Sequence, residues 1–109
     1  MNKGVIGLGI WCVDTTYKIS ELPERGKLEP ILDSFQCVGG GPSNVLTNLN
    51  SLGFNHPLIA MGLLGKDANA LIIKKHCKKN NILINNFIIS STTPTSQVVC
   101  MFEEQKERT

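Results

Sequence analysis

Hydrophobic residues run almost without interruption through the first part of the chain. The segment from Val5 to Val13 is apolar and partly β-branched. Such a run is typical of a central strand that a parallel sheet buries on both faces. Two further extended segments, Thr15 to Ile19 and Leu28 to Val38, flank the turn-forming stretch from Glu21 to Gly26. This order predicts a buried first strand followed by a hairpin-like excursion from the main sheet.

A helical period replaces the extended pattern after a run of glycines. The spacing predicts a helix from Pro42 to Leu52, because its apolar residues fall on one side of a helical wheel. These residues are Val45, Leu46, Leu49 and Leu52. Pro42 suits the first helical position, where its missing N–H costs nothing, and Gly53 suits the helix end.

A second helix is predicted from Ala68 to Lys79, with Asn80 and Asn81 ending it. Its apolar face consists of Ala70, Ile72, Ile73 and Cys77. Its opposite face consists of Lys74, Lys75, Lys78 and Lys79. We interpret the lysines as a solvated helix face, because no aromatic residues alternate with them as in nucleic-acid-binding surfaces.

The remaining apolar runs are short and predict strands. They are Leu58 to Met61, Ile82 to Ile89 and Gln97 to Phe102, with turns at Gly62 to Asp67 and Ser90 to Ser96. Strands and helices alternate after the early β-excursion. The order therefore predicts an α/β domain with a small β-appendage.

Composition and charge narrow the function classes. The 109 residues are 41% hydrophobic and 18% charged, which suits a chain that buries a core. Eleven basic and nine acidic residues leave a net charge of only +2. So small an excess provides no electrostatic attraction for nucleic acid or an anionic membrane, and no apolar run is long enough to span one.

The four cysteines bear on the cellular compartment. They are widely spaced, and no C-x-x-C pair is among Cys12, Cys37, Cys77 and Cys100. We interpret them as small buried hydrophobes, with a disulfide or metal framework as the alternative. The apolar start of the chain lacks the cleavage site of a signal peptide. We therefore expect no metal site and a cytoplasmic location.

The glycine run before the first helix is a candidate ligand site. Gly39, Gly40 and Gly41 allow a ligand to approach the backbone, and the following helix directs its unpaired N–H groups to the same place. Asn44 could add a donor and an acceptor for a polyhydroxylated or anionic ligand. The alternative is that the glycines form only a tight strand-to-helix turn. The residues alone leave both interpretations open.

Asp14 is the second candidate. It follows the predicted first strand, so its carboxylate should project at the carboxyl end of that strand, where open α/β sheets bind ligands. A carboxylate accepts hydrogen bonds from vicinal hydroxyls, as a sugar ligand would require. The alternative is a residue that merely forms the turn at the strand end.

Several of these motifs, taken in order, resemble the ribokinase-like, or PfkB-type, carbohydrate kinases. Gly39-Gly40-Gly41-Pro42-Ser43-Asn44 is similar to the first signature of the family, and Val5 to Asp14 resembles its first strand and sugar-binding aspartate. Gly62-Leu63-Leu64-Gly65-Lys66-Asp67 resembles the G-x-x-G-x-D segment, and Thr95 to Thr109 resembles a lid hairpin. The match is collinear over almost the whole chain.

The resemblance implies a fold, a site and partners. The expected fold is α/β, the N-terminal part of a ribokinase-like Rossmann-type three-layer fold with a small β-lid at about 15–38 and 97–109. Asp14, Gly40, Gly41 and Asn44 would bind the hydroxyls of a sugar or nucleoside, although ribokinase has Lys where this chain has Gly41. In several relatives the lid also forms a homodimer contact. ATP and Mg²⁺ are the expected cofactors of the full-length family.

One family motif is missing from this sequence. The second signature, an Asp-Thr-x-Gly-Ala-Gly-Asp-like stretch, provides the catalytic base, the anion hole and much of the ATP pocket, and it occurs nowhere in residues 1–109. We therefore expect residues 1–109 to be the sugar-binding amino-terminal third of an ATP-dependent carbohydrate kinase, without a catalytic residue. Alone, it should be inactive and bind neither cofactor well. The alternative is a non-catalytic sugar-binding or lid-mediated dimerisation module.

Overall fold

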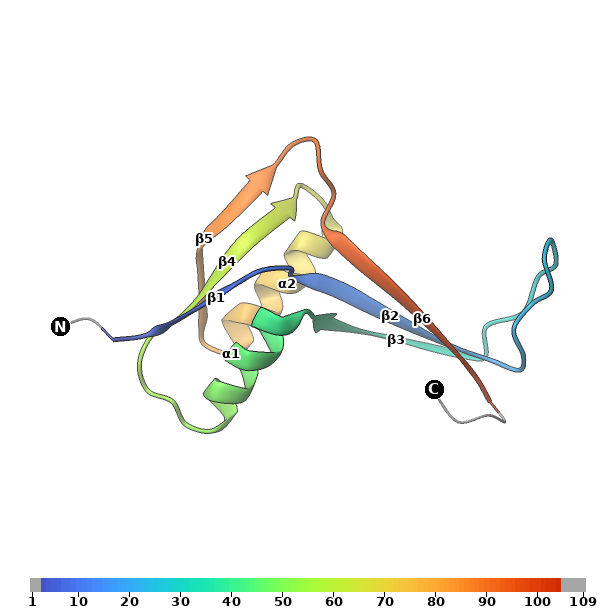
Figure 1. The fold of residues 1–109 in the computed structure, drawn as a ribbon, viewed down its shortest axis with the longest axis horizontal. Coiled ribbons are helices and arrows are strands. Elements are labelled where there is room, and N and C mark those ends of the chain that lie inside the picture. The colour runs from blue at the N-terminus through green and yellow to red at the C-terminus, as the bar shows by residue number, and fades with distance from the viewer. Residues whose placement is uncertain (1–2, 105–109) are drawn as a thin grey trace.

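The computed structural model describes residues 3–104, which form two helices and two three-stranded sheets (Figure 1). In chain order, the elements are β1 (Val5–Leu8), β2 (Cys12–Ile19), β3 (Asp33–Gly39), α1 (Gly41–Ser51), β4 (Leu58–Gly65), α2 (Ala68–Lys79), β5 (Ile82–Ser90) and β6 (Ser96–Glu103). The predicted α/β class is confirmed. The lid hairpin predicted to Thr109 lies partly outside the described residues, which end at Glu104.

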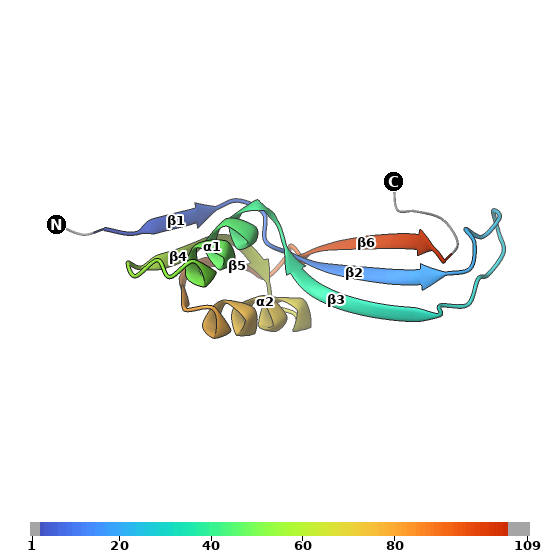
Figure 2. The same ribbon diagram turned by 90° about the horizontal axis from the view of Figure 1, so that it is seen from below.

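The first sheet is parallel and has the strand order β1-β4-β5. Its two helices lie on one face (Figure 2), because both crossovers advance across the sheet in the same direction and parallel crossovers are right-handed. Leu46 of α1 and Ile73 of α2 are fully buried against this face. Burying each of these side chains stabilises the fold by about 1.5–3 kcal/mol.

The opposite face of the first sheet has no helix over it among the described residues. Its side chains include Ile6, Leu8 and Leu83, of which Leu8 is 68% exposed. The prediction that the first strand is buried on both faces is therefore wrong for the described chain. Only Val5 and Gly7 of β1 face the helices, because successive side chains of a strand point to opposite faces.

The long apolar run Val5–Val13 is not one strand, contrary to the sequence prediction. β1 ends at Leu8, the chain bends through Gly9–Trp11, and β2 begins at Cys12 in the other sheet. Trp11 explains the break: its side chain is 1% exposed, its indole N–H donates to the Met61 carbonyl at 3.2 Å, and its ring meets Phe87 edge-on. Packing of this ring between distant segments overrides the continuous strand pattern.

The second sheet has the order β3-β2-β6 and extends away from the helices (Figures 1 and 2). β2 pairs antiparallel with β3 from Cys12 to Lys18, and parallel with β6 along its whole length. The radius of gyration is 16.7 Å, against about 13 Å for a compact domain of this size. The chain is therefore elongated, and its second sheet is an arm on an α/β body.

The predicted helices exist, but α1 is rotated relative to its predicted apolar face. Val45 and Leu52 are exposed, whereas Ser43 is buried beside Leu46. The reason is that α1 packs on β1 and also on α2, where its small polar residues meet His76. In α2 the predicted face is confirmed, with Ala70, Ile73 and Cys77 buried and Ile72 partly buried.

Two further sequence expectations need correction. The strand predicted at Leu58–Met61 continues to Gly65, so the predicted turn at Gly62–Asp67 shrinks to two residues before α2. All four cysteines are free, but only Cys12 and Cys77 are buried and Cys37 is exposed at the edge strand β3. Neither helix of the described residues has the length and apolar character that crossing a membrane would require.

Candidate functional site

The predicted site residues gather where the arm joins the body. Asp14 is the third residue of β2, opposite Cys37 of β3 and Val98 of β6. It thus lies inside the second sheet, beyond the end of β1, and not at the carboxyl end of the first strand as predicted. The bend at Trp11 moves it there.

The Asp14 carboxylate lies directly over the backbone of Gly39, the last residue of β3. A Cβ atom on Gly39 would overlap that carboxylate. Gly40 follows with φ 102°, a conformation that favours glycine, and a Cβ atom there would overlap the Ile10 carbonyl oxygen. Backbone conformation and the Ile10 carbonyl explain Gly40, and Gly39 leaves room for the Asp14 carboxylate in its observed position.

Gly41 has no such explanation. A Cβ atom built on it would contact no atom within 4 Å, and the residue is exposed at the start of α1. The space beside the Gly41 backbone is open to a ligand. The sequence left two interpretations of the glycine run, and its members divide between them: Gly39 and Gly40 shape the turn, and Gly41 borders open space.

The amino terminus of α1 carries no side-chain cap. Gly40 is the N-cap residue, and its carbonyl accepts only from the Asn44 backbone N–H at 3.1 Å. The Asn44 side chain is exposed and makes no hydrogen bond to residues 3–104. Pro42 has no N–H and Ser43 is buried, so the Gly41 N–H and the positive end of the helix dipole are what this exposed helix start offers to a ligand.

A buried thiol holds Asp14 in place. Cys12 Sγ donates to Asp14 Oδ1 at 3.2 Å. Burial, and then the neighbouring Asp14 carboxylate, raises the pKa of the Cys12 thiol to about 11, so the thiol stays protonated at neutral pH and remains a donor. A carboxylate has about four lone-pair sites, so Asp14 can still accept hydrogen bonds from a ligand. Sequence reasoning did not assign this role to Cys12.

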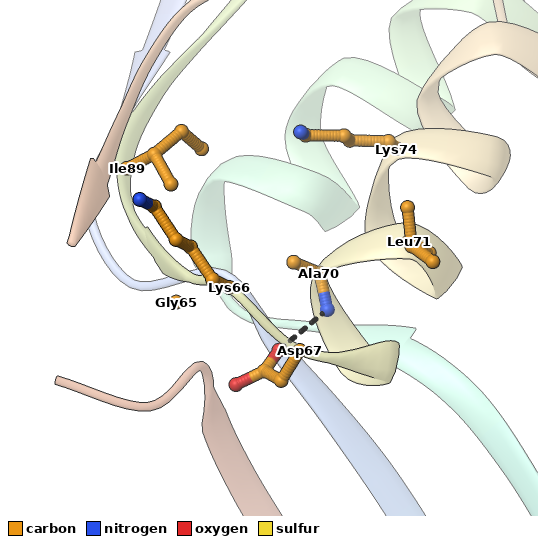
Figure 3. Close-up of a pocket in the computed structure, with 7 residues that line it drawn as sticks. All are labelled: Gly65, Lys66, Asp67, Ala70, Leu71, Lys74 and Ile89. Carbon is orange, nitrogen blue, oxygen red and sulfur yellow. Dashed lines mark hydrogen bonds between the residues drawn. The ribbon is translucent and has the colours of Figure 1, made fainter. Parts of the chain in front are cut away.

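The aspartate of the G-x-x-G-x-D segment belongs to a different cluster. Asp67 is the N-cap of α2, and its carboxylate accepts from the Ala70 N–H at 2.9 Å (Figure 3). It also accepts from the Thr95 N–H at 2.9 Å and from the Thr95 hydroxyl at 2.7 Å. These bonds, those of Thr95 first, hold the pKa of Asp67 below its usual range.

Thr95 connects the two sheets at this point. Besides its bonds to Asp67, its hydroxyl oxygen accepts from the Gly65 N–H at 2.9 Å, and the residue is buried. Thr95 immediately precedes β6, so the network joins the ends of β4 and α2 to the arm. The sequence indicated only a turn there, because nothing in a Ser- and Thr-rich stretch distinguishes a buried threonine from exposed ones.

A cavity of about 290 Å³ lies beside Asp67 (Figure 3). Lys66, Lys74, Leu71 and Ile89 line it together with the start of α2. The Asp67 carboxylate, the one acidic group among the lining residues, accepts from three donors of the chain itself, so most of its acceptor capacity is used within the fold. Within residues 3–104, no three or more His, Cys, Asp or Glu side chains are arranged to hold a metal ion.

A family model described as pfkB family carbohydrate kinase matches residues 7–109. It therefore includes Asp14, the glycine run, Asn44 and the Asp67–Thr95 network. No curated protein sequence matches the chain significantly.

Solved structures with the same fold come from several organisms. Ribokinase of Arabidopsis thaliana, complexed with ribose and ATP, superposes with a TM-score of 0.87 at 20% identity, covering 98% of this chain and 34% of that chain. Fructokinase of Xylella fastidiosa with bound ATP has a TM-score of 0.70 at 22% identity, covering 93% and 30%. The nucleoside kinase of Methanocaldococcus jannaschii has a TM-score of 0.79 at 17% identity, covering 95% and 34%. The chain thus spans about a third of each structure.

Proposed function

Because the chain belongs to the pfkB family of carbohydrate kinases, we propose that it binds the hydroxyl-bearing acceptor of an ATP-dependent phosphoryl transfer. The acceptor is a sugar or a nucleoside, the two substrate classes named for structures of the same fold. Residues 1–109 then form the acceptor-binding part of such a kinase domain.

The arrangement at the junction of the two sheets supports this proposal. Asp14 presents a carboxylate over Gly39 at the point where β3 passes into the uncapped amino terminus of α1. The carboxylate would accept from vicinal hydroxyls, and the exposed Gly41 N–H would donate to a hydroxyl oxygen. Asn44 adds an amide that can do both. The placement of the Asp14 carboxylate is the observation that carries the assignment.

The second sheet fits a lid over this acceptor. β2 and β6 start near the site and β3 ends there, so all three strands extend from it. Asp14 lies on the same sheet face as Cys12, Cys37 and Val98. Closure of such a sheet on a bound sugar would exclude water, so that the phosphoryl group passes to the sugar and is not hydrolysed. This lid comprises residues 12–19, 33–39 and 96–103 of the described chain.

Catalysis itself would require groups that this sequence does not contain. ATP with Mg²⁺ supplies the transferred phosphoryl group, and phosphoryl transfer is accelerated mainly by positioning and by electrostatic stabilisation of the transferred group. The Asp-Thr-x-Gly-Ala-Gly-Asp-like stretch that would provide the base and anion hole is absent from residues 1–109. The proposed activity of the chain alone is therefore acceptor binding, in a cytoplasmic setting that suits its four free cysteines.

Titration calorimetry of the whole chain with pentoses, hexoses and nucleosides tests the binding. Asp14→Asn should weaken binding of the preferred acceptor by about tenfold or more, because a hydrogen bond to a charged group contributes about 1.5–3 kcal/mol. Asp33→Asn is the matched control, since Asp33 lies in the same sheet at the far end of β3. Absence of heat with every acceptor, or equal losses in the two variants, would overturn the assignment.

A phosphotransfer assay with Mg²⁺ and labelled ATP tests the catalytic part separately. The pure chain should form no sugar phosphate at any acceptor concentration that saturates binding. Turnover by pure protein, abolished together with acceptor binding in Asp14→Asn, would show that the missing signature is not required.

One observation favours a second candidate, a non-catalytic module that dimerises through the lid. The second sheet exposes Phe35, Val99 and Met101, and both its edge strands, β3 and β6, lack a further strand among the described residues. Exposed strand edges pair readily with other chains. Sedimentation at increasing concentration should show a dimer that Val99→Lys and Met101→Lys disrupt; a monomer at all concentrations would exclude this function.

A further inference from the structure

A second cavity lies on the side of the molecule where β3 packs against α2. Its volume is about 520 Å³. One wall is residues 36–38 of β3, and the other is formed by Ile72, Lys75, His76 and Lys79 of α2. It is separate from the cavity of Figure 3, which lies at the opposite, amino-terminal end of α2. It is large enough for a small ring-containing molecule.

The charged groups of this cavity are all positive. Lys75 and Lys79 are one helical turn apart, and neither forms an ion pair within residues 3–104. No acidic residue lines the cavity. Two unpaired ammonium groups on the rim of one cavity create a positive potential that an anion would neutralise. Of the four lysines on α2, Lys75 and Lys79 line this cavity, whereas Lys74 and Lys78 do not.

His76 adds a neutral, oriented ring to the same wall. Its Nε2 lies 3.0 Å from Thr47 Oγ1 and 3.4 Å from Ser43 Oγ, whereas Nδ1 has no hydrogen-bond partner in the described chain. When the two hydroxyls donate to Nε2, the proton of the neutral ring is on Nδ1, which becomes a donor. Burial, and then the charge of Lys79, holds the pKa of His76 below its usual range.

The floor of the cavity is apolar, and the polar Gln36 side chain at its edge uses only part of its hydrogen-bonding capacity. Val38 and Ile72 provide aliphatic surface. Gln36 uses one amide hydrogen for Thr15 Oγ1 at 3.2 Å, which leaves the second for a ligand. Cations above an aliphatic floor suit a molecule with an anionic group on a ring.

We propose that the cavity between β3 and α2 binds a phosphate monoester, with Lys75 and Lys79 holding the phosphate group and Val38 and Ile72 contacting the ring that carries it. This is a site distinct from the proposed acceptor site, although both involve β3. One wall belongs to the second sheet and the other to a helix of the body, so the bound ester would also hold the sheet against the body.

Nuclear magnetic resonance of the whole chain, titrated with inorganic phosphate, ribose 5-phosphate and AMP, tests the proposal. Signals of His76 and of residues 36–38 should shift with saturation. The double variant Lys75→Gln, Lys79→Gln should weaken binding by about tenfold or more, since charge-assisted hydrogen bonds are about twice as strong as neutral ones. Lys75→Arg with Lys79→Arg should retain binding, because both charges and donors remain.

The matched control is Lys74→Gln with Lys78→Gln, which removes the same charge from the same helix outside the cavity. It should leave affinity within about twofold, as expected for screened surface charges. Equal losses in the two double variants, or no shift with any probe at millimolar concentration, would overturn the site. Tighter binding of ribose 5-phosphate or AMP than of inorganic phosphate supports the role of the aliphatic floor, whereas equal affinity would overturn that role.

The pKa of His76 provides a second readout. Bound phosphate should raise it, because an anion favours the imidazolium and offsets the charge of Lys79. The hydroxyls of Ser43 and Thr47 contact the ring, Lys79 acts on it by its charge, and Lys75 and Cys37 are the other titratable groups that line the cavity. The rise should vanish in Lys75→Gln, Lys79→Gln; an unchanged pKa in the wild type at saturating phosphate would contradict the site.

Discussion

The two sheets of this chain are stabilised in different ways. The first, β1-β4-β5, rests on α1 and α2, and most of the fully buried side chains lie between them. The second, β3-β2-β6, extends beyond the helices, and most residues of β3 and β6 are exposed or only partly buried. Its connection to the body runs through contacts near Trp11, Gly39 and Thr95 and through the packing of β2 and β3 on α2.

This difference separates the source of stability from the location of the candidate chemistry. Hydrophobic burial in the body provides the dominant folding energy. Asp14 and Gly40 lie at the border of the two regions, where the arm depends on the body for its orientation. A sheet with little core of its own can move relative to the body at low cost, as a lid must.

The largest expected effect is on the core of the body. Ile73→Ala removes a fully buried side chain between α2 and the first sheet, and should lower the free energy of unfolding by about 2–5 kcal/mol. Val99→Ala in β6, which is 60% exposed, should change it by no more than about 0.5 kcal/mol. Urea denaturation of both variants measures the contrast. Similar losses would show that the arm contributes to the core as much as the body does.

A smaller effect is expected where the two regions join. Thr95→Val leaves the buried Gly65 N–H without its acceptor and Asp67 Oδ1 with only the Ala70 donor, which should cost about 1–3 kcal/mol. Amide exchange should accelerate in β6 and remain slow in α2, because the arm loses its connection while the helix keeps its Ala70 cap. Thr93→Val, at an exposed position of the same loop, is the control. Uniform acceleration throughout the chain would refute a local role.

The Asp67 carboxylate should make this junction sensitive to acid. Its pKa in the folded chain lies below the ordinary value of 3.8, because Thr95 and Ala70 donate to the carboxylate. The stabilisation is therefore present above pH 3.8 and is lost as the pH falls through the folded pKa. The stability advantage of the wild type over Asp67→Asn should be constant at neutral pH and shrink in acid. An advantage independent of pH would be evidence against the ionised carboxylate as the acceptor.

The smallest expected effect is a difference in reactivity between a cysteine of the body and a cysteine of the arm. Burial raises the pKa of Cys77 in the body to about 12, whereas Cys37 in the arm is exposed. Iodoacetamide at pH 8 should therefore alkylate Cys37 first and Cys77 only after unfolding, because the thiolate is the reactive form. Mass spectrometry over time follows both sites, and Cys37→Ser should remove the fast phase. Early labelling of Cys77 would mean that the body opens as readily as the arm.

Local patterns predicted most of the elements. α2 spans the residues that its period predicted, Ala68 to Lys79, and its buried face was predicted as well. This prediction succeeds because Ala70, Ile73 and Cys77 fall on one side of the helical wheel and are all buried in the core. α1, by contrast, packs against a strand and a second helix at once. The helical wheel assumed a single apolar face and therefore predicted that Val45 is buried, whereas this residue is 54% exposed.

The candidate site was only partly predictable. Asp14, Gly40, Gly41 and Asn44 are recognisable as a motif, but a motif does not specify which member shapes the turn and which borders open space. Gly40 is needed because the Ile10 carbonyl lies against it, a contact between two different segments. The thiol donor Cys12 and the buried Thr95 carried no local signal, since their partners are defined only after folding.

The sequence by itself determined the α/β class, the two helices, the alternation of extended and helical segments along the chain and the family motif, because each depends on residue type and short-range spacing. Only the tertiary structure decided where the first apolar run breaks, which face of the first sheet is left open, and that Asp14 belongs to the second sheet. The physical reason is that these features depend on contacts between distant segments, chiefly the packing of Trp11 against Phe87 and the Met61 carbonyl. No periodicity within a short window records such contacts.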